Sequence, residues 1–304
     1  MILSASRRTD LPRWYAPWLM ERLRAGRVLV RDPVSPGRIS RVPLSPEVVD
    51  CIVFWTKDPA TLLPYLPELE AMGHRFYFQF TLTPYGPDLE PGLRDKPALI
   101  ETFQALSRRV GRERVLWRYD PILFRGGYSL PWHREQFTRM CEQLSPFTES
   151  VTISFLDLYP RLERMGMEAP GAREIEAMAE HIGRTAARTG LRAQACAEAR
   201  ELTPYGIRPA ACIDRALLER ICGAPLDLGP AKSQRPGCGC CDSVDIGTYD
   251  TCRTGCLYCY ADHERRTVEP HDPRGELLVG SLRLGDVVKD RACASSLSTQ
   301  TSLF

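Results

Sequence analysis

The chain has 304 residues, of which 43% are hydrophobic, so it is long enough to bury a full core in one large α/β domain or in two smaller ones. Its formal charge of +2 at pH 7 is close to neutral, and nothing in it demands a polyanionic partner. The first residues lack the pattern of a secretory signal, and no apolar stretch approaches the roughly 18 residues that cross a bilayer, which excludes a membrane-spanning protein and predicts a cytoplasmic one.

Short apolar, β-branched or aromatic runs predict buried strands along most of the chain. In chain order they are residues 2–6, 28–31, 51–55, 75–82, 114–119, 151–155, 191–196 and 244–248. Apolar spacing of three and four predicts helices at residues 16–25, 60–72, 96–110, 132–144, 171–189 and 215–222. Because strand and helix alternate, we expect parallel βα units in an α/β fold, a partial (βα)6 TIM-like barrel with functional loops at the carboxyl ends of its strands.

The pattern changes near residue 223. Residues 1–222 are expected to form the main part of the barrel, whereas residues 223–304 begin with a stretch rich in Gly, Pro and Cys and end in a polar tail from residue 261. We interpret residues 223–304 as a metal-organised segment that completes the barrel.

Twelve cysteines are too many for core filler in a chain of this size, and a reducing cytoplasm disfavours disulfides. Half of them lie close together in the sequence, at Cys238, Cys240, Cys241, Cys252, Cys256 and Cys259. This clustering favours metal or redox chemistry.

Cys252, Cys256 and Cys259 are separated by three and then two residues. Three thiolates at this spacing can come from one tight loop and occupy three corners of a 4Fe-4S cluster, which leaves the fourth iron open to bind S-adenosylmethionine (SAM). A structural zinc site needs four ligands and usually spaces them as C-x2-C pairs, so zinc fits this triple less well. A zinc site completed by Cys238 or Cys240 is the alternative.

The motif C-x3-C-x-aromatic-C, with Tyr258 at the aromatic position, resembles the signature of radical SAM enzymes. The run from Cys256 to Ala261 is similar to the branch that contains spore photoproduct lyase and its DNA-repair-photolyase-like relatives. Three further segments resemble that branch, and they are residues 6–10 (Ser-Arg-Arg-Thr-Asp), Thr56-Lys57 and Arg118-Tyr-Asp-Pro-Ile122.

This resemblance implies a 4Fe-4S cluster, bound SAM, and an electron donor such as ferredoxin or flavodoxin. It places Arg7, Arg8, Thr9, Asp10, Lys57 and Tyr258 beside SAM, and Arg118 and Asp120 among the catalytic residues. The alternatives are a helix N-cap by Thr9 or Asp10 with solvated arginines, a surface Lys57, and a buried ion pair of Arg118 with Asp120.

The order of the motifs departs from the radical SAM family, in which the cysteine triple follows the first strand. If residues 244–248 are equivalent to that first strand and residues 2–6 to the second, the chain is a circular permutation of the barrel. The two strands should then pair in parallel. This arrangement, with Trp55-Thr-Lys and a C-terminal Ser-Leu-Phe, also resembles an uncharacterised bacterial family, the domain of unknown function numbered 1848.

Four further cysteines, Cys196, Cys212, Cys238 and Cys240, are candidates for a second site. They predict an auxiliary 4Fe-4S cluster, with a structural zinc site or unliganded thiols as alternatives and with Cys241 able to replace Cys240. Glu198 and Asp214 follow two of these cysteines by two residues and could support them.

Two functions follow from these patterns. The first is a radical SAM enzyme that cleaves SAM reductively to a 5′-deoxyadenosyl radical, which abstracts hydrogen from an unknown substrate; the resemblance points to nucleic acid or a nucleotide, and a small metabolite or peptide fits the charge equally well. The second is a zinc-stabilised, non-catalytic nucleic-acid-binding or scaffold protein.

Overall fold

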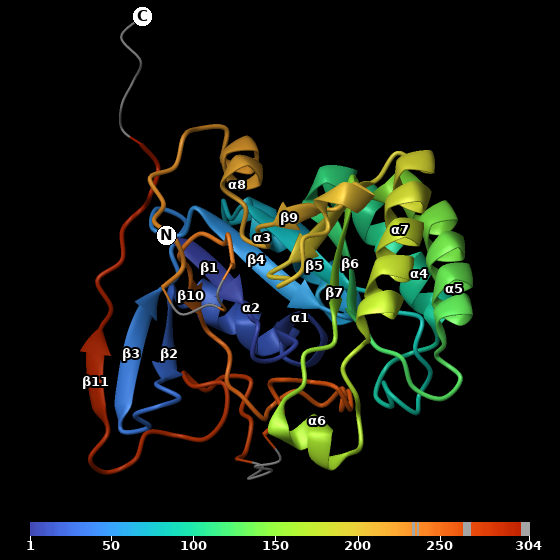
Figure 1. The fold of residues 1–304 in the computed structure, drawn as a ribbon. Coiled ribbons are helices and arrows are strands. Elements are labelled where there is room, and N and C mark those ends of the chain that lie inside the picture. The colour runs from blue at the N-terminus through green and yellow to red at the C-terminus, as the bar shows by residue number, and fades with distance from the viewer. Residues whose placement is uncertain (233–234, 236, 264–268, 299–304) are drawn as a thin grey trace, which may run out of the picture.

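The computed structural model describes residues 1–232, 235, 237–263 and 269–298 (Figure 1); the predicted C-terminal Ser-Leu-Phe lies outside them. Eight strands form the main sheet in the order β10-β1-β4-β5-β6-β7-β8-β9, and every neighbouring pair is parallel. Their bounds are β1 (Ile2–Ala5), β4 (Cys51–Thr56), β5 (Phe76–Thr81), β6 (Val115–Ile122), β7 (Ser150–Phe155), β8 (Arg192–Cys196), β9 (Arg208–Ala210) and β10 (Val244–Asp245). Within the described residues the edge strands β10 and β9 do not pair, so the sheet is open.

The strand near the cysteine triple pairs with the first strand of the chain. Strand β10 lies parallel to β1, with Leu3 opposite Val244 and Ser4 opposite Asp245. The predicted parallel pairing of these two segments is confirmed, although β10 is shorter than residues 244–248. Residues from the two ends of the sequence therefore build one edge of the main sheet.

The predicted strand 28–31 belongs to a second sheet. Strands β2 (Arg27–Arg31) and β3 (Arg38–Pro43) pair antiparallel, and β11 (Val287–Asp290) pairs in parallel with β3. A connection as short as residues 32–37 can form a hairpin, whereas a parallel neighbour needs a longer crossover. Asp32 closes the hairpin, since its Oδ1 accepts hydrogen bonds from the N–H groups of Val34 and Ser35 at 2.8 Å. The polar tail also supplies a strand, β11, that the sequence pattern did not predict.

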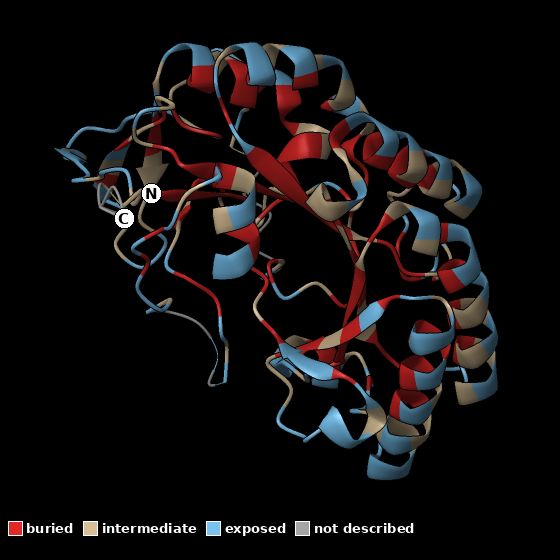
Figure 2. Ribbon diagram, turned by 90° about the horizontal axis from the view of Figure 1, so that it is seen from above, coloured by how far each residue is buried: buried red, intermediate tan, exposed pale blue. Residues whose placement is uncertain are grey.

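Most helices lie along one face of the main sheet (Figure 2), whereas the helix Arg215–Cys222 packs on the opposite face, where its Leu217 and Leu218 join the apolar cluster of Ile2, Val53 and Tyr77. The longer ones are α2 (Ala16–Arg24), α4 (Lys96–Val110), α5 (Leu130–Leu144), α7 (Ala172–Arg188) and α8 (Arg215–Cys222), and the short ones are α1 (Leu11–Trp14), α3 (Leu66–Ala71) and α6 (Pro160–Arg164). The predicted helix 60–72 is instead two 3-10 turns, Pro59–Thr61 and Leu63–Tyr65, followed by α3. Pro64 and Pro67 lack the N–H group that a continuous helix needs there. Among the described helices, none is long and apolar enough to span a membrane.

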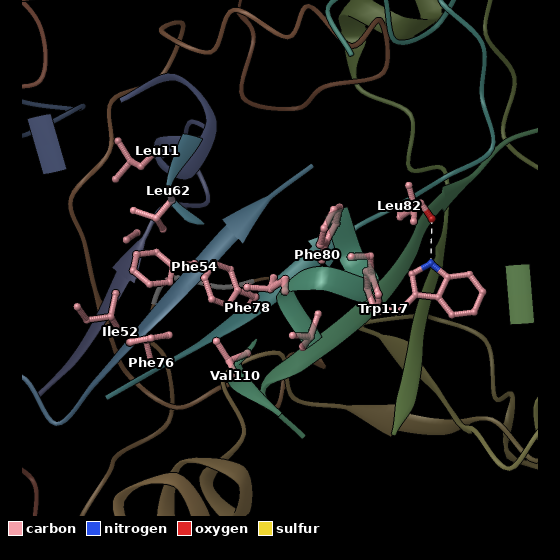
Figure 3. Packing of buried hydrophobic residues seen from close by; sticks show 14 of the residues in the cluster. Leu11, Ile52, Phe54, Leu62, Phe76, Phe78, Phe80, Leu82, Val110 and Trp117 are labelled. Atoms are coloured by element: carbon pink, nitrogen blue, oxygen red, sulfur yellow. Dashed lines mark hydrogen bonds between the residues drawn. The ribbon is translucent and has the colours of Figure 1, made fainter. Parts of the chain in front are cut away.

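Side chains alternate between the two faces of the main sheet, as the two-residue period of a strand requires. One face carries the large apolar core toward the helices, including Phe54, Phe78 and Trp117 (Figure 3). The Trp117 indole N–H donates to the Leu82 carbonyl at 2.9 Å and so fixes the start of the loop after β5. The opposite face carries the alternate side chains of the same strands, such as Val53 and Tyr77. It is called the inner face below.

Candidate functional site

The inner face changes from apolar to polar along its strands. Near the amino ends it carries residues such as Val53 and Tyr77, whereas two residues further along the same strands it carries Trp55 and Gln79. Arg118 lies on the same face of β6, and its side chain is buried. Buried polar groups are costly unless they have partners, so their concentration at the carboxyl ends marks the functional end of the sheet.

Contacts with the N-terminal part of the chain hold the cysteine loop, residues 249–261, at this end of the sheet. Its Thr254 carbonyl accepts from the Gly92 N–H at 2.9 Å, and its Thr254 Oγ1 accepts from the Trp14 indole at 2.9 Å. The Tyr15 hydroxyl donates to the Thr251 carbonyl at 2.6 Å. Helix α1 and the loop after β5 therefore position the loop that carries the cysteine triple.

The three thiols of the triple lie in a mostly buried setting. Cys256 is buried, and Cys252 and Cys259 are half-buried. Burial raises the pKa of all three thiols, that of Cys259 to about 11. The negative charge of another member of the triple or of a nearby acid also raises the pKa of each thiol. Thiolates in this setting need a positive partner, because burial of an unpaired charge is costly.

Lys57 supplies positive charge next to the triple, through a network centred on Glu90. Its Nζ donates to Glu90 Oε1 at 2.7 Å and to the Tyr258 hydroxyl at 2.9 Å, and its charge lowers the pKa of Cys256. Glu90 also accepts hydrogen bonds from Tyr258, Lys96 and, at 2.7 Å, from Thr83 Oγ1. Although burial alone would raise the pKa of Glu90, the two lysines hold it at about 2. The predicted residues Lys57 and Tyr258 are thus brought together, by an acid that sequence reasoning missed.

Asp245 of β10 organises the loop that follows β1. Its carboxylate accepts from Ser4 Oγ at 2.8 Å, from Ser6 Oγ at 2.5 Å and from the Arg7 N–H at 2.8 Å. Sequence reasoning also missed this residue, although an acid between Val244 and Ile246 in an apolar strand signals a carboxylate that must find partners when buried.

Residues 7–10 lie between β1 and α1. Asp10 caps α1, since its Oδ1 accepts from the Arg13 N–H at 3.1 Å, and its Oδ2 accepts from the Lys57 N–H at 2.8 Å. Arg8 donates to the Gly247 carbonyl at 3.3 Å, and the Arg7 guanidinium stacks 4.8 Å from the centre of the Trp55 ring. Asp10 therefore serves as a helix cap, the alternative that the sequence left open, and Arg7 is directed onto the inner face.

Several buried polar atoms in this region have no hydrogen-bond partner among the described residues. They are Arg7 Nη2, Thr9 Oγ1, Trp55 Nε1 and Gln79 Oε1. Buried polar atoms are almost always satisfied in folded proteins, so a group of unsatisfied atoms on the inner face and on the loop after β1 is typical of a place that receives a polar ligand.

Arg118 and Asp120 form an ion pair in which Arg118 is buried and Asp120 is half-buried, close to the alternative that the sequence left open for them. Arg118 also donates from Nη1 to the Cys212 sulfur at 2.8 Å, and Asp120 accepts from Ser154. The negative charges of Glu90 and, to a smaller extent, of Asp120 raise the pKa of Lys57. Arg118 therefore faces the second set of cysteines, while its acid partner lies within electrostatic reach of Lys57.

Three of the four cysteines predicted for a second site lie together. Cys196 Sγ is 3.1 Å from Cys212 Sγ, and the Cys240 thiol is hydrogen-bonded to Cys212. These hydrogen bonds from Cys196 and Cys240 lower the pKa of Cys212 below its ordinary value. Cys238 is half-buried on the same loop as Cys240 and packs against the cluster that contains the three cysteines, and Cys241 lies beside Arg215.

The two acids predicted to support these cysteines have other partners. Glu198 Oε1 accepts from the Phe155 N–H at 2.8 Å, and Asp214 caps α8 by accepting from the Leu217 N–H at 2.8 Å. Gln79, whose face the sequence left open, lies on the inner face and donates to the Cys212 carbonyl at 2.6 Å.

The described residues contain no group of three or more His, Cys, Asp or Glu side chains already arranged to hold a metal ion. The donor chemistry nevertheless fits a soft metal at both cysteine groups, because thiolates are the ligands of iron–sulfur clusters and of zinc. The unsatisfied atoms Arg7 Nη2 and Thr9 Oγ1, on the loop after β1, fit a polar ligand.

Comparison with known proteins adds one family. The family described as Domain of unknown function (DUF1848) matches residues 2–261. No curated protein matches the sequence. Among solved structures, a protein of Bacteroides thetaiotaomicron that is provisionally assigned as an alpha-L-fucosidase matches with 12% sequence identity and a TM-score of 0.25, over 69% of this chain and 82% of that chain. A TM-score this low carries no argument about fold or activity.

Proposed function

Since the chain belongs to the Domain of unknown function (DUF1848) family, whose description names no reaction, we propose from the site itself that it is a radical SAM enzyme. Cys252, Cys256 and Cys259 would hold a 4Fe-4S cluster that binds SAM. The observation that carries the proposal is that three thiols from one loop lie within electrostatic reach of one another, with Lys57 as the neighbouring cation.

When bound, such a cluster with SAM supplies a 5′-deoxyadenosyl radical after one-electron reduction, which abstracts hydrogen from a substrate. The chain's own residues bind and orient. Lys57 and Glu90 hold Tyr258 and hence the second half of the cysteine loop, and Asp245 holds the loop that carries Arg7. Arg7 Nη2 and Thr9 Oγ1, which are buried without a recorded partner, would bind polar groups of SAM.

The fold supports a finer proposal, a circularly permuted partial TIM-like barrel. The strand β10 before the cysteine loop lies beside β1, so the two act as consecutive units of one parallel sheet although they stand at opposite ends of the sequence. The functional residues follow β1, β4, β5 and β10 at one end of the sheet, as they do in barrel enzymes. A ferredoxin or flavodoxin is the proposed electron donor.

The test uses protein purified without oxygen. Wild type should contain iron and labile sulfide, and should release 5′-deoxyadenosine when SAM and dithionite are added. The Cys256→Ala variant should lose this release, because the cluster loses a ligand. The matched control is Cys141→Ala, which removes a buried thiol of helix α5, far from the loop in sequence, and should keep the release.

Two results would contradict the proposal. A colourless wild-type protein that contains zinc and no sulfide would favour the zinc-stabilised scaffold instead. Full release of 5′-deoxyadenosine by Cys256→Ala would show that the cluster is bound elsewhere.

A further inference from the structure

We propose that Cys196, Cys212 and Cys240 form a second metal site, distinct from the SAM-binding triple and independent of the proposed function, that binds a soft metal as a zinc ion or as an iron–sulfur cluster. The three thiols come from three separate segments. Cys196 is the last residue of β8, Cys212 follows β9, and Cys240 lies in the loop before β10. Their sulfur atoms nevertheless meet at the carboxyl ends of these strands.

The spacing of the sulfurs is close to that of metal ligands. Two thiolates on one tetrahedral ion with Zn–S bonds of about 2.3 Å lie roughly 3.8 Å apart. Cys196 Sγ and Cys212 Sγ are 3.1 Å apart and share a hydrogen bond. A soft metal replaces the shared proton, because thiolates and not thiols are the ligands, and the side chains need to separate by only about 0.7 Å for a single ion.

Cys212 is held by more polar contacts than packing requires of a core thiol. Its carbonyl accepts from the Tyr77 hydroxyl at 2.8 Å and from Gln79 Nε2 at 2.6 Å, and its sulfur accepts from Arg118 Nη1 at 2.8 Å. A guanidinium that donates to a sulfur stabilises negative charge on it, and hydrogen bonds of this kind orient metal ligands and tune clusters. Cys240 Sγ likewise accepts from the Ile213 N–H at 3.4 Å.

Neither apolar packing nor a disulfide accounts for all three thiols. An isolated core thiol behaves as a small hydrophobe, as at Cys141, which is the only cysteine among the buried residues of its core cluster in the described structure. A disulfide would join only Cys196 and Cys212 and leave Cys240 and the Arg118 contact without a role. Three sulfurs that converge beside a cation fit a soft metal better than either.

The fourth ligand has one candidate on the same loop. Cys238 precedes Cys240 by two residues and is half-buried, whereas the thiol of Cys241 lies beside Arg215. Structural zinc and 4Fe-4S sites alike are completed by four protein ligands, so Cys238 is the residue to test for that place.

The experiment separates the two cysteine groups. A variant with Cys252→Ala, Cys256→Ala and Cys259→Ala is purified without oxygen, and its zinc, iron and sulfide are measured. We expect about one zinc ion, or about four irons with sulfide, per chain. Adding Cys196→Ala and Cys212→Ala should remove this metal, and adding Cys241→Ala instead should not. Circular dichroism checks that each variant is folded.

The reciprocal measurement uses a variant with Cys196→Ala and Cys212→Ala in which Cys252, Cys256 and Cys259 are intact. This variant should keep the iron bound by those three cysteines. The proposal is overturned if the folded triple variant contains no metal, if the Cys196 and Cys212 substitutions leave the metal content of that variant unchanged, or if mass spectrometry finds these two cysteines joined in a disulfide. A triple variant with the same metal content as wild type would contradict the proposed function and leave this second site in place.

Discussion

Glu90 and Asp245 are buried or half-buried carboxylates that hold the candidate site together, and each owes its place to the partners that surround it. Glu90 binds Lys57 and Lys96, and Asp245 binds two serine hydroxyls and two backbone N–H groups. An ionised carboxylate in such a position is tolerable only when nearly every lone pair is used. Glu90 lies in no recognisable motif, and the partners of both acids became visible only when distant segments met.

The buried imidazole of His133 also has a partner for each of its polar atoms, although it is kept neutral. Its Nε2–H donates to the Leu123 carbonyl at 2.8 Å, and its Nδ1 accepts from the Tyr119 hydroxyl at 2.8 Å. Burial lowers the pKa of His133 from 6.5 to about 4, and the rings that face it are those of Tyr85, Phe124 and Trp132.

This histidine predicts a pH dependence of stability. The unfolded chain takes up a proton near pH 6.5, whereas the folded chain takes it up only near pH 4, so the free energy of unfolding should fall as the pH is lowered through that window. Between pH 7 and pH 5 His133 should account for a loss of about 2 kcal/mol. Urea unfolding at both pH values should show a steeper loss in wild type than in His133→Gln, and equal losses would contradict the assignment.

At the scale of elements, the close approach of two loops decides where the cysteine triple lies. The N–H of Gly92, in the loop after β5, donates to the Thr254 carbonyl in the cysteine loop at 2.9 Å. A Cβ atom at Gly92 would lie 2.5 Å from that carbonyl oxygen, and both partners are backbone, which cannot rotate away. A glycine is therefore required for the two loops to touch.

We expect Gly92→Ala to displace the cysteine loop and to reduce the iron bound by Cys252, Cys256 and Cys259, with a loss of stability of about 1–3 kcal/mol from overpacking. The metal of Cys196, Cys212 and Cys240 should change little, because this contact does not reach it. Iron and sulfide analysis checks the prediction.

Gly127→Ala is the matched control for this substitution, because a Cβ atom there would meet nothing within 4 Å. Iron content in Gly92→Ala equal to that of this control would show that the loop contact does not position the triple.

At the scale of the whole molecule, the two ends of the described chain meet at one edge of the main sheet. The Met1 amino group donates to the Ala294 carbonyl at 2.8 Å and forms an ion pair with Asp50. Ser295 Oγ and the Ser296 N–H also donate to Asp50, at 2.5 and 2.8 Å. Chains whose ends lie this close tolerate new connections at the surface.

A rearranged chain opened after the exposed Lys232, with a Gly/Ser linker that joins the old C-terminus to Met1, should therefore fold and bind metal as wild type does. In it β10 and the cysteine loop precede β1 directly. Loss of the Met1 ammonium costs a hydrogen bond to Asp50, of the order of 1–3 kcal/mol. Metal content and thermal unfolding are the measurements.

A second rearranged chain, opened between Trp117 and Arg118, should fail to fold because it interrupts a central strand. If both rearranged chains are equally unfolded, the ends of the sequence are not free to be rejoined.

The sequence by itself determined the elements that depend on local pattern. Seven of the eight predicted strands lie in the main sheet, and the helices 96–110 and 215–222 have the predicted bounds, because apolar periodicity and N-terminal Asp caps are read within a few residues. The spacing of Cys252, Cys256 and Cys259 likewise marked one loop as a metal candidate. The parallel pairing of residues 244–245 with β1 was also predictable, from the order of the motifs.

Only the tertiary structure decided which side chains meet. It placed residues 28–31 in a second sheet, broke the helix expected at residues 60–72, and selected Cys240 over Cys241 as the neighbour of Cys212. It also joined Arg118 to Cys212 across 94 positions of sequence. The physical reason is that a local pattern sets which face a residue occupies, whereas a partner for a buried charge or thiol is set by chain crossings that bring distant segments to the same end of a sheet.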